Sequence, residues 1–146
     1  INDLELQNLS LKFSDIVLKK IIQTKYIKGA YNFLLKCSKN FDCFICTGTP
    51  KNEIDEILKK KNINHLFKGI YGSPMEKIKI ISEIINKWNL KANEIIYFGD
   101  SMTDYYAAKK SKIKFYCING LNIKKKIEIY KDFNDFEKKN ILKWQI

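Results

Sequence analysis

The sequence predicts an α/β fold of three layers, in which helices cover both faces of a mostly parallel β-sheet. Three observations support this prediction. β-branched and aromatic runs of strand length alternate with longer segments whose apolar residues recur at helical spacing. The run Ile95–Phe98 has no polar alternation, as expected of an interior strand that is covered on both faces. The chain of 146 residues is also long enough to bury one hydrophobic core.

The first half of the chain contains two expected helices, a strand and a third helix. Residues 13–23 carry an apolar stripe at helical spacing, and residues 28–40 form a second helix after a Lys-Gly turn. The β-branched and aromatic run in residues 41–50 predicts a strand that ends in a Gly/Pro turn. Residues 52–62 repeat apolar residues at i, i+3 and i+4, which is typical of an amphipathic helix.

The second half continues the same alternation. The expected elements are a strand, a helix, a strand, a helix and a strand in residues 67–74, 75–89, 94–100, 103–111 and 113–118. Strands joined through helices form βαβ units, so the expected architecture is Rossmann-like. The tail from Leu121 is expected to add an edge strand around Ile127–Tyr130 and a closing helix.

The formal charge of +11 raises the question of a polyanionic partner such as nucleic acid. However, the cationic residues are all lysine, and arginine, which binds guanine edges and phosphates through two parallel hydrogen bonds, is absent. The lysines are spread over the expected helix faces, so we expect no specific nucleic-acid partner. No apolar run reaches the length of a membrane span. We therefore expect a soluble cytoplasmic protein without a membrane partner.

The four cysteines are Cys37, Cys43, Cys46 and Cys117. Cys43 and Cys46 have the spacing of a redox or zinc pair, but residues three apart on a strand point to opposite faces of the sheet. The sequence therefore predicts buried free thiols in a reducing compartment, rather than a disulfide or a metal site.

Polar residues stand at the ends of three expected strands or in the turns that follow them, at the sheet edge where parallel α/β folds bind ligands. Thr47 and Gly48 lie where the strand in residues 41–50 is expected to stop; they either hold a phosphate oxygen or form only a turn. Lys77 follows a Gly/Pro turn and begins a helix, where a cation is mildly unfavourable unless an anion is near. The alternative is that Lys77 is one more solvated lysine, and Lys79 is a possible substitute for it.

Asp100 and Asp104 belong to the stretch FGDSMTD, which follows the most apolar strand. Ser101 and Asp104 fit the capping-box pattern, which by itself explains Asp104. It does not explain Asp100, a carboxylate directly after a buried strand and a glycine. Carboxylates from a strand end and a first helical turn can converge on Mg²⁺, which takes one or two carboxylates together with water and phosphate oxygens. We therefore expect both aspartates to hold Mg²⁺.

These residues occur in an order that resembles the haloacid dehalogenase-like (HAD) hydrolase superfamily. The resemblance covers residues 26–118, and FGDSMTDYYAAKKSKIKFYCI is its most specific part. The stretch YGSP ahead of Lys77 is similar to the phosphoglycolate-phosphatase-like branch.

The resemblance implies a Mg²⁺-dependent phosphatase that acts on a small phosphorylated metabolite through an aspartyl-phosphate. It implies that Thr47, with Gly48 beside it, hydrogen-bonds the transferring phosphoryl group and that Lys77 neutralises its charge. Asp100 and Asp104 would position Mg²⁺, and this acidic pair favours phosphoryl transfer over dehalogenation, which in this superfamily proceeds without the metal.

One motif of the superfamily has no match in the chain. Its nucleophile and acid/base residue are two aspartates in an Asp-x-Asp motif at the end of the first strand, and the sequence contains no Asp-x-Asp. Residues 1–25 are instead similar to the last helix and return linker of a helical cap. We therefore expect a cap remnant in residues 1–25 and a HAD-like α/β core in residues 26–146 that lacks its first strand and is inactive alone.

The resemblance places that first strand between the strand of Thr47 and the strand of Asp100. Without it we expect poor folding or a gap in the middle of the sheet, because each orphaned backbone group costs about 1–3 kcal/mol of a total stability of about 5–15 kcal/mol. The alternative to an enzyme is a non-catalytic HAD-like module that keeps the phosphate and Mg²⁺ pocket.

Overall fold

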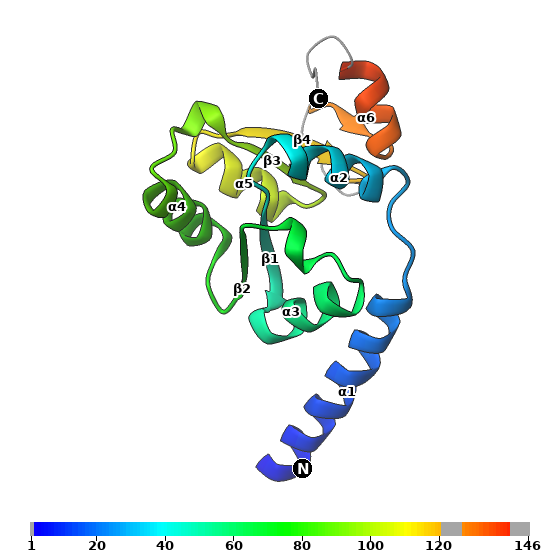
Figure 1. Ribbon diagram of the computed structural model, residues 1–146. Coiled ribbons are helices and arrows are strands. Elements are labelled where there is room, and N and C mark those ends of the chain that lie inside the picture. The colour runs from blue at the N-terminus through cyan, green and yellow to red at the C-terminus, as the bar shows by residue number, and fades with distance from the viewer. Residues whose placement is uncertain (1, 121–126, 141–146) are drawn as a thin grey trace.

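The computed structural model describes residues 2–120 and 127–140, which form an α/β structure of parallel strands flanked by helices, as predicted (Figure 1). The helices are α1 (Asp3–Gln23), α2 (Ala30–Asn40), α3 (Lys51–Lys60), α4 (Lys77–Trp88), α5 (Met102–Lys110) and α6 (Phe133–Asn140). The strands are β1 (Phe44–Pro50), β2 (Gly69–Ser73), β3 (Ile96–Gly99), β4 (Lys114–Ile118) and β5 (Ile129–Tyr130). Short 3₁₀ turns at Asn64–Leu66 and Ala92–Glu94 precede β2 and β3.

The described strands form two parallel sheets instead of one. One sheet has the order β1-β2 and the other has the order β3-β4-β5. Phe44 lies opposite Gly69 in the first sheet, and Ile96 lies opposite Lys114 in the second. The sheets therefore separate between β1 and β3, where the sequence analysis expects a gap.

Successive backbone carbonyls of β1 point alternately toward β2 and toward the break between the two sheets. The carbonyl of Cys43 accepts a hydrogen bond of 2.8 Å from the backbone N–H of Lys68, just ahead of β2. Cys46 lies an odd number of residues further on, so its carbonyl points to the other edge of β1. There it lies 3.3 Å from the hydroxyl of Tyr97 on β3, and this contact spans the break.

Two hydrophobic clusters cover the opposite faces of the second sheet, which gives the three expected layers. One cluster joins α2 and α6 to the ends of β4 and β5; its buried residues are Phe33, Cys37, Ile118, Tyr130 and Phe136. The other joins α4 and α5 to the strands through Ile81, Ala107, Ala108 and Ile113. Cys43 packs against the first cluster and Cys46 against the second, so they face opposite sides as predicted, and all four cysteines are free thiols.

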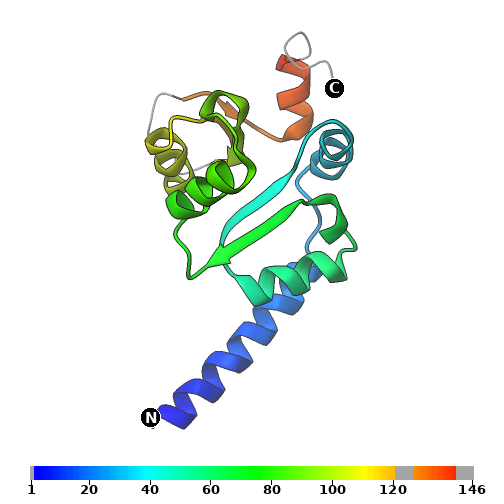
Figure 2. The same cartoon turned by 60° about the vertical axis from the view of Figure 1, so that its left-hand side comes forward.

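The helix α1 is longer than predicted. It begins at Asp3 rather than at residue 13, because Asn2 and Glu5 form a capping box through hydrogen bonds of 2.8 and 2.9 Å. It extends away from the two sheets (Figures 1 and 2) and has no buried residue. Ser14 and Glu53, 3.0 Å apart, connect it to α3. Within the described residues, no helix is both long and apolar enough to span a membrane.

The tail follows the prediction where the structure describes it. The strand β5 pairs in parallel with β4, with Ile118 opposite Tyr130, and forms the outer edge of its sheet. The helix α6 then packs Phe136 into the first cluster. The remaining parts of the expected tail, residues 121–126 and 141–146, lie outside the described residues.

Candidate functional site

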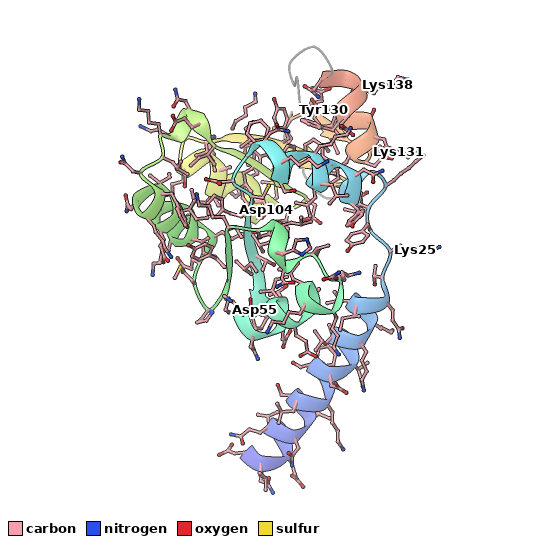
Figure 3. All side chains as sticks on the ribbon, viewed as in Figure 1. Lys25, Asp55, Asp104, Tyr130, Lys131 and Lys138 are labelled. Carbon is pink, nitrogen blue, oxygen red and sulfur yellow. The ribbon has the colours of Figure 1, made fainter. Side chains whose placement is uncertain are left out.

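Four predicted site residues line one cavity of about 270 Å³: Thr47, Lys77, Asp100 and Asp104. They come from four elements that are far apart in the sequence, namely β1, the start of α4, the end of β3 and the first turn of α5. The cavity thus lies at the break between the two sheets, and Asp104 lies near the centre of the molecule (Figure 3). Gly48 is exposed and does not line the cavity.

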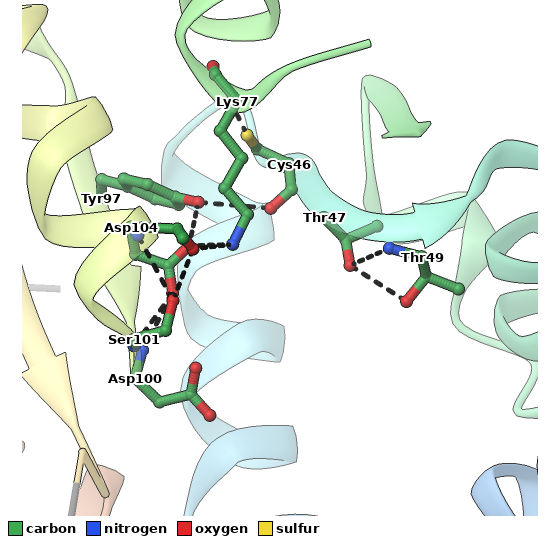
Figure 4. A network of polar contacts seen from close by, with 9 residues as sticks. Cys46, Thr47, Thr49, Lys77, Tyr97, Asp100, Ser101 and Asp104 are labelled. Atoms are coloured by element: carbon green, nitrogen blue, oxygen red, sulfur yellow. Dashed lines mark hydrogen bonds and ion pairs between the residues drawn. The ribbon is translucent and has the colours of Figure 1, made fainter. Parts of the chain in front are cut away.

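Thr47 is placed differently from the expectation that its strand stops there. The strand β1 continues to Pro50, although its pairing with β2 becomes irregular after Cys46. The Thr47 hydroxyl donates to Thr49 Oγ1 at 3.2 Å and accepts from the Thr49 backbone N–H at 3.2 Å (Figure 4). The Thr47 hydroxyl has one proton, which it donates to Thr49 Oγ1. It can therefore donate to a phosphate oxygen only if that oxygen replaces Thr49 Oγ1 as the acceptor.

Lys77 is the first residue of α4, as predicted, and the anion that it faces is Asp104. Its ammonium lies 2.7 Å from Asp104 Oδ1 and 3.1 Å from Thr103 Oγ1. The side chains of Lys77 and Asp104 are 21% and 7% exposed, so this ion pair is much less accessible to water than an ordinary surface pair. It fixes the start of α4 against the start of α5.

Asp104 accepts hydrogen bonds from five donors (Figure 4). Oδ1 accepts from Lys77 and, at 2.6 Å, from the hydroxyl of Tyr97. Oδ2 accepts from the backbone N–H groups of Asp100 and Ser101 and from the Ser101 hydroxyl, which completes the predicted capping box. A carboxylate offers about four lone-pair positions. Asp104 is therefore saturated by protein donors, and its role in this structure is to hold other site residues in place.

Asp100 has the opposite environment. Its side chain is exposed, and within the described residues its carboxylate accepts no hydrogen bond and forms no ion pair. It lines the cavity and points away from Asp104 in Figure 4. The described residues also contain no group of three or more His, Cys, Asp or Glu side chains that could enclose a metal ion. Asp100 therefore fits Mg²⁺ as a single carboxylate ligand among water and substrate oxygens. Asp104 fits as a residue beside that ligand, which supports the site through its hydrogen bonds.

Tyr97 is a site residue that the sequence analysis did not single out. It lies in β3, and burial first and the hydrogen bond to Asp104 second raise its pKa far above the usual range, so the phenol stays a neutral donor. A signal was present in the sequence, because a tyrosine within an otherwise apolar strand needs a partner for its hydroxyl. That partner, seven residues away, is not visible without the fold.

The pKa of Asp104 makes the site sensitive to acid. Burial acts to raise this pKa, but hydrogen bonds from Lys77, Tyr97 and Ser101 outweigh burial and lower it below its ordinary value. Stability from these contacts is thus present above the unfolded-state pKa of about 3.9 and is lost as the pH falls through the lower folded-state pKa. We expect the free energy of unfolding, measured in urea from pH 6 to pH 2.5, to fall less steeply in Asp104→Asn than in the parent. Parallel curves would contradict this.

Gly99 provides the space in which Asp104 sits. A Cβ at Gly99 would lie 2.5 Å from Asp104 Cβ and 2.7 Å from Asp104 Cγ, which is closer than real contacts allow. We therefore expect Gly99→Ala to displace α5 and to lower the free energy of unfolding by about 1–3 kcal/mol. Gly48→Ala is the control, because a Cβ there meets nothing within 4 Å. Equal stability of the two variants in urea unfolding would contradict the tight contact.

Sequence comparison identifies one family. A family model described as haloacid dehalogenase-like hydrolase matches residues 3–118. The match includes α1, which the sequence predicted to be the remnant of a helical cap. Among curated proteins, no sequence is similar enough to this chain to count as a match.

Solved structures share the fold at low sequence identity. A haloacid dehalogenase-like hydrolase of Streptococcus pneumoniae is similar with a TM-score of 0.73 and 20% identity, covering 97% of this chain and 72% of that one. A predicted phosphoglycolate phosphatase of Haemophilus somnus has a TM-score of 0.79 and 18% identity, covering 96% and 68%. A HAD-hydrolase of Bacillus subtilis, whose structure contains magnesium, has a TM-score of 0.64 and 19% identity, covering 81% and 55%.

Proposed function

Because the chain belongs to the haloacid dehalogenase-like hydrolase family, matched over residues 3–118, we propose that it forms the phosphate- and Mg²⁺-binding part of a phosphatase. The observation that carries this proposal is the convergence of Thr47, Lys77 and Asp100 on one cavity. A hydroxyl, an ammonium and a free carboxylate in one cavity match the needs of a phosphoric monoester and its metal ion. The similar phosphoglycolate phosphatase structure agrees with this class of reaction.

Each side chain has a distinct role in the proposed hydrolysis. Lys77 places a fixed positive charge beside the phosphoryl oxygens, and Thr47 donates a hydrogen bond to one of them. Asp100 would hold Mg²⁺, which neutralises charge on the phosphoryl oxygens when bound. Asp104 keeps Lys77 at the cavity and fixes the first turn of α5. Because Asp104 is saturated by donors, we propose that it acts on the metal only through its neighbours.

The nucleophile of the proposed reaction is an aspartate outside residues 1–146, in an Asp-x-Asp motif that this sequence does not contain. We propose that it is carried by a strand that pairs between β1 and β3. Both strands have one edge without a strand partner among the described residues, and an added strand would give backbone partners to groups such as the Cys46 carbonyl. Its carboxyl end would then lie beside Thr47 and Asp100.

The proposed substrate is a small phosphorylated metabolite in the cytoplasm. A cavity of about 270 Å³ has room for a phosphate and a few further heavy atoms. Phe98, Ile118 and Phe133 also line it, so the cavity offers apolar as well as polar contacts. Residues 1–25, which include the whole of α1, are proposed to belong to a helical cap that closes over the substrate.

The experiment that tests this function begins with the coding sequence ahead of Ile1. We expect it to encode a strand that ends in Asp-x-Asp, and we expect the protein that includes it to hydrolyse p-nitrophenyl phosphate only with Mg²⁺. The matched control replaces the first aspartate of that motif by asparagine and should remove turnover. A protein that contains the motif, folds, and still hydrolyses no phosphate monoester would contradict a phosphatase.

The second candidate is a non-catalytic module that binds phosphate and Mg²⁺. The absence of an Asp-x-Asp motif from the 146 residues favours it. It predicts that orthophosphate binds to the chain in the presence of Mg²⁺ and that no form of the protein turns over a phosphate monoester. Calorimetric titration with orthophosphate, together with the turnover assay, separates the two candidates.

A further inference from the structure

Tyr97 connects the two sheets at the point where the proposed phosphate site lies. Its hydroxyl is 2.6 Å from Asp104 Oδ1 and 3.3 Å from the carbonyl oxygen of Cys46. Both neighbours are acceptors, and a phenol has one proton. The shorter contact to the charged oxygen therefore holds that proton, and the Cys46 contact is a weaker second interaction.

The same carboxylate oxygen also receives Lys77. Asp104 Oδ1 accepts from Tyr97 on β3 and from Lys77 on α4, while Oδ2 is held by the turn that begins α5. Lys77 reaches this oxygen at the end of a flexible four-carbon chain. Its ammonium has three donors, and within the described residues it bonds to two acceptors, Asp104 Oδ1 and Thr103 Oγ1. One N–H of Lys77 is thus available to a ligand in the cavity that it lines.

We propose that Tyr97 is a positioning residue, which sets where the Lys77 ammonium lies and how strongly it attracts an anion. A neutral donor on Oδ1 shares that oxygen with Lys77, so less of the negative charge of Asp104 is directed at the ammonium. The hydrogen bond also prevents the carboxylate from rotating toward Lys77 and away from the cavity. Tyr97 acts through Asp104 and touches no reacting atom. The effect on anion affinity rests on the proposed function, whereas the effect on the placement of Lys77 does not.

The matched pair of variants is Tyr97→Phe and Tyr106→Phe. Each removes one phenolic hydroxyl and keeps the ring; Tyr106 is 50% exposed and lies on α5, the helix that carries Asp104. In the chain of residues 1–146 with Mg²⁺ present, we expect Tyr97→Phe to weaken orthophosphate binding about tenfold, because Asp104 then attracts the Lys77 ammonium more strongly and leaves less of its charge to the anion. We expect Tyr106→Phe to change it less than twofold. Calorimetric titration measures both.

A second measurement separates positioning from a merely structural role. The ¹³Cε–¹⁵Nζ resonance of Lys77, assigned by its disappearance in Lys77→Met, should be distinct from those of the solvated lysines in the parent chain and in Tyr106→Phe. In Tyr97→Phe we expect it to move further from the position of the solvated lysines, because Asp104 then holds the Lys77 ammonium more strongly. A Lys77 resonance that Tyr97→Phe leaves in place overturns the proposal, even if that variant melts at a lower temperature.

The two measurements also keep the two proposals apart. If the parent chain binds no orthophosphate, the proposed function loses its support, and the Lys77 resonance alone decides the role of Tyr97. If the parent binds orthophosphate and Tyr97→Phe binds it equally well, the positioning role is overturned while the proposed function stands.

Discussion

Replacing Asp104 by alanine is expected to lower the free energy of unfolding by about 3 kcal/mol, because it breaks a largely buried ion pair and leaves several donors without their acceptor. The variant removes the acceptor of Lys77 and Tyr97 at once, together with the capping box of α5. Urea unfolding with circular dichroism at neutral pH measures the loss. The expected loss in the free energy of unfolding is large because the Asp104 side chain is buried, with 7% of it exposed.

The control for this prediction is Asp55→Ala. Asp55 is also a helical aspartate paired with a lysine, Lys51, but their side chains are 37% and 49% exposed. The two aspartates lie in different parts of the molecule (Figure 3). An exposed pair four residues apart on a helix contributes about 0.3–0.5 kcal/mol, so Asp55→Ala should be nearly silent. A loss of similar size in both variants would show that the Asp104 network contributes no more than a surface pair.

The second large effect is expected at Asp100, and it concerns activity rather than stability. In the protein that carries the nucleophile, Asp100→Asn should reduce Mg²⁺-dependent turnover of p-nitrophenyl phosphate by at least about a hundredfold, because it removes the proposed metal ligand. Its free energy of unfolding should change by less than about 0.5 kcal/mol, because exposed positions away from special features tolerate substitution. The exposed carboxylate without a protein partner is the structural reason.

Thr103→Val controls for a general disturbance of the same turn. Thr103 is exposed and its hydroxyl bonds to Lys77 and Ser101, so its loss should alter turnover far less than the loss of Asp100. Full turnover by Asp100→Asn at limiting Mg²⁺ would contradict the proposed ligand. Unfolding of Asp100→Asn would instead point to a structural role that the exposed side chain does not suggest.

The alternation of helices and strands could be predicted from the sequence because it depends on local patterns. Apolar periodicity and Gly/Pro turns locate β1 to β4 and α2 to α5 close to their observed bounds. The start of α1 was missed because its apolar residues, such as Leu4 and Leu6, occur on more than one side of the helix. The separation of the strands into two sheets was expected only through the family resemblance, since pairing between distant strands leaves no local signal.

The candidate site shows the same division between local and long-range information. The capping box of Ser101 and Asp104 lies within four residues and was predicted correctly. The partners of Asp104 across the fold, Lys77 and Tyr97, could not be predicted, because their meeting depends on how α4 and β3 pack together. Asp100 and Asp104 look alike in the sequence, and burial alone gives them different environments: one is exposed and the other is enclosed by donors.

The break between the two sheets also affects how the molecule opens. The strand β1 reaches the clusters of the second sheet through Cys43 and Cys46, and the described contacts between β1 and β3 include the weak one from Tyr97 to Cys46. Proteins open in cooperative units whose boundaries fall where contacts are few. Helix α4 contacts β1 and helix α5 contacts β3 and β4, so the ion pair between Lys77 and Asp104 connects the two sheets. We expect the two sheets to fluctuate together while this pair holds and to open separately once it is lost.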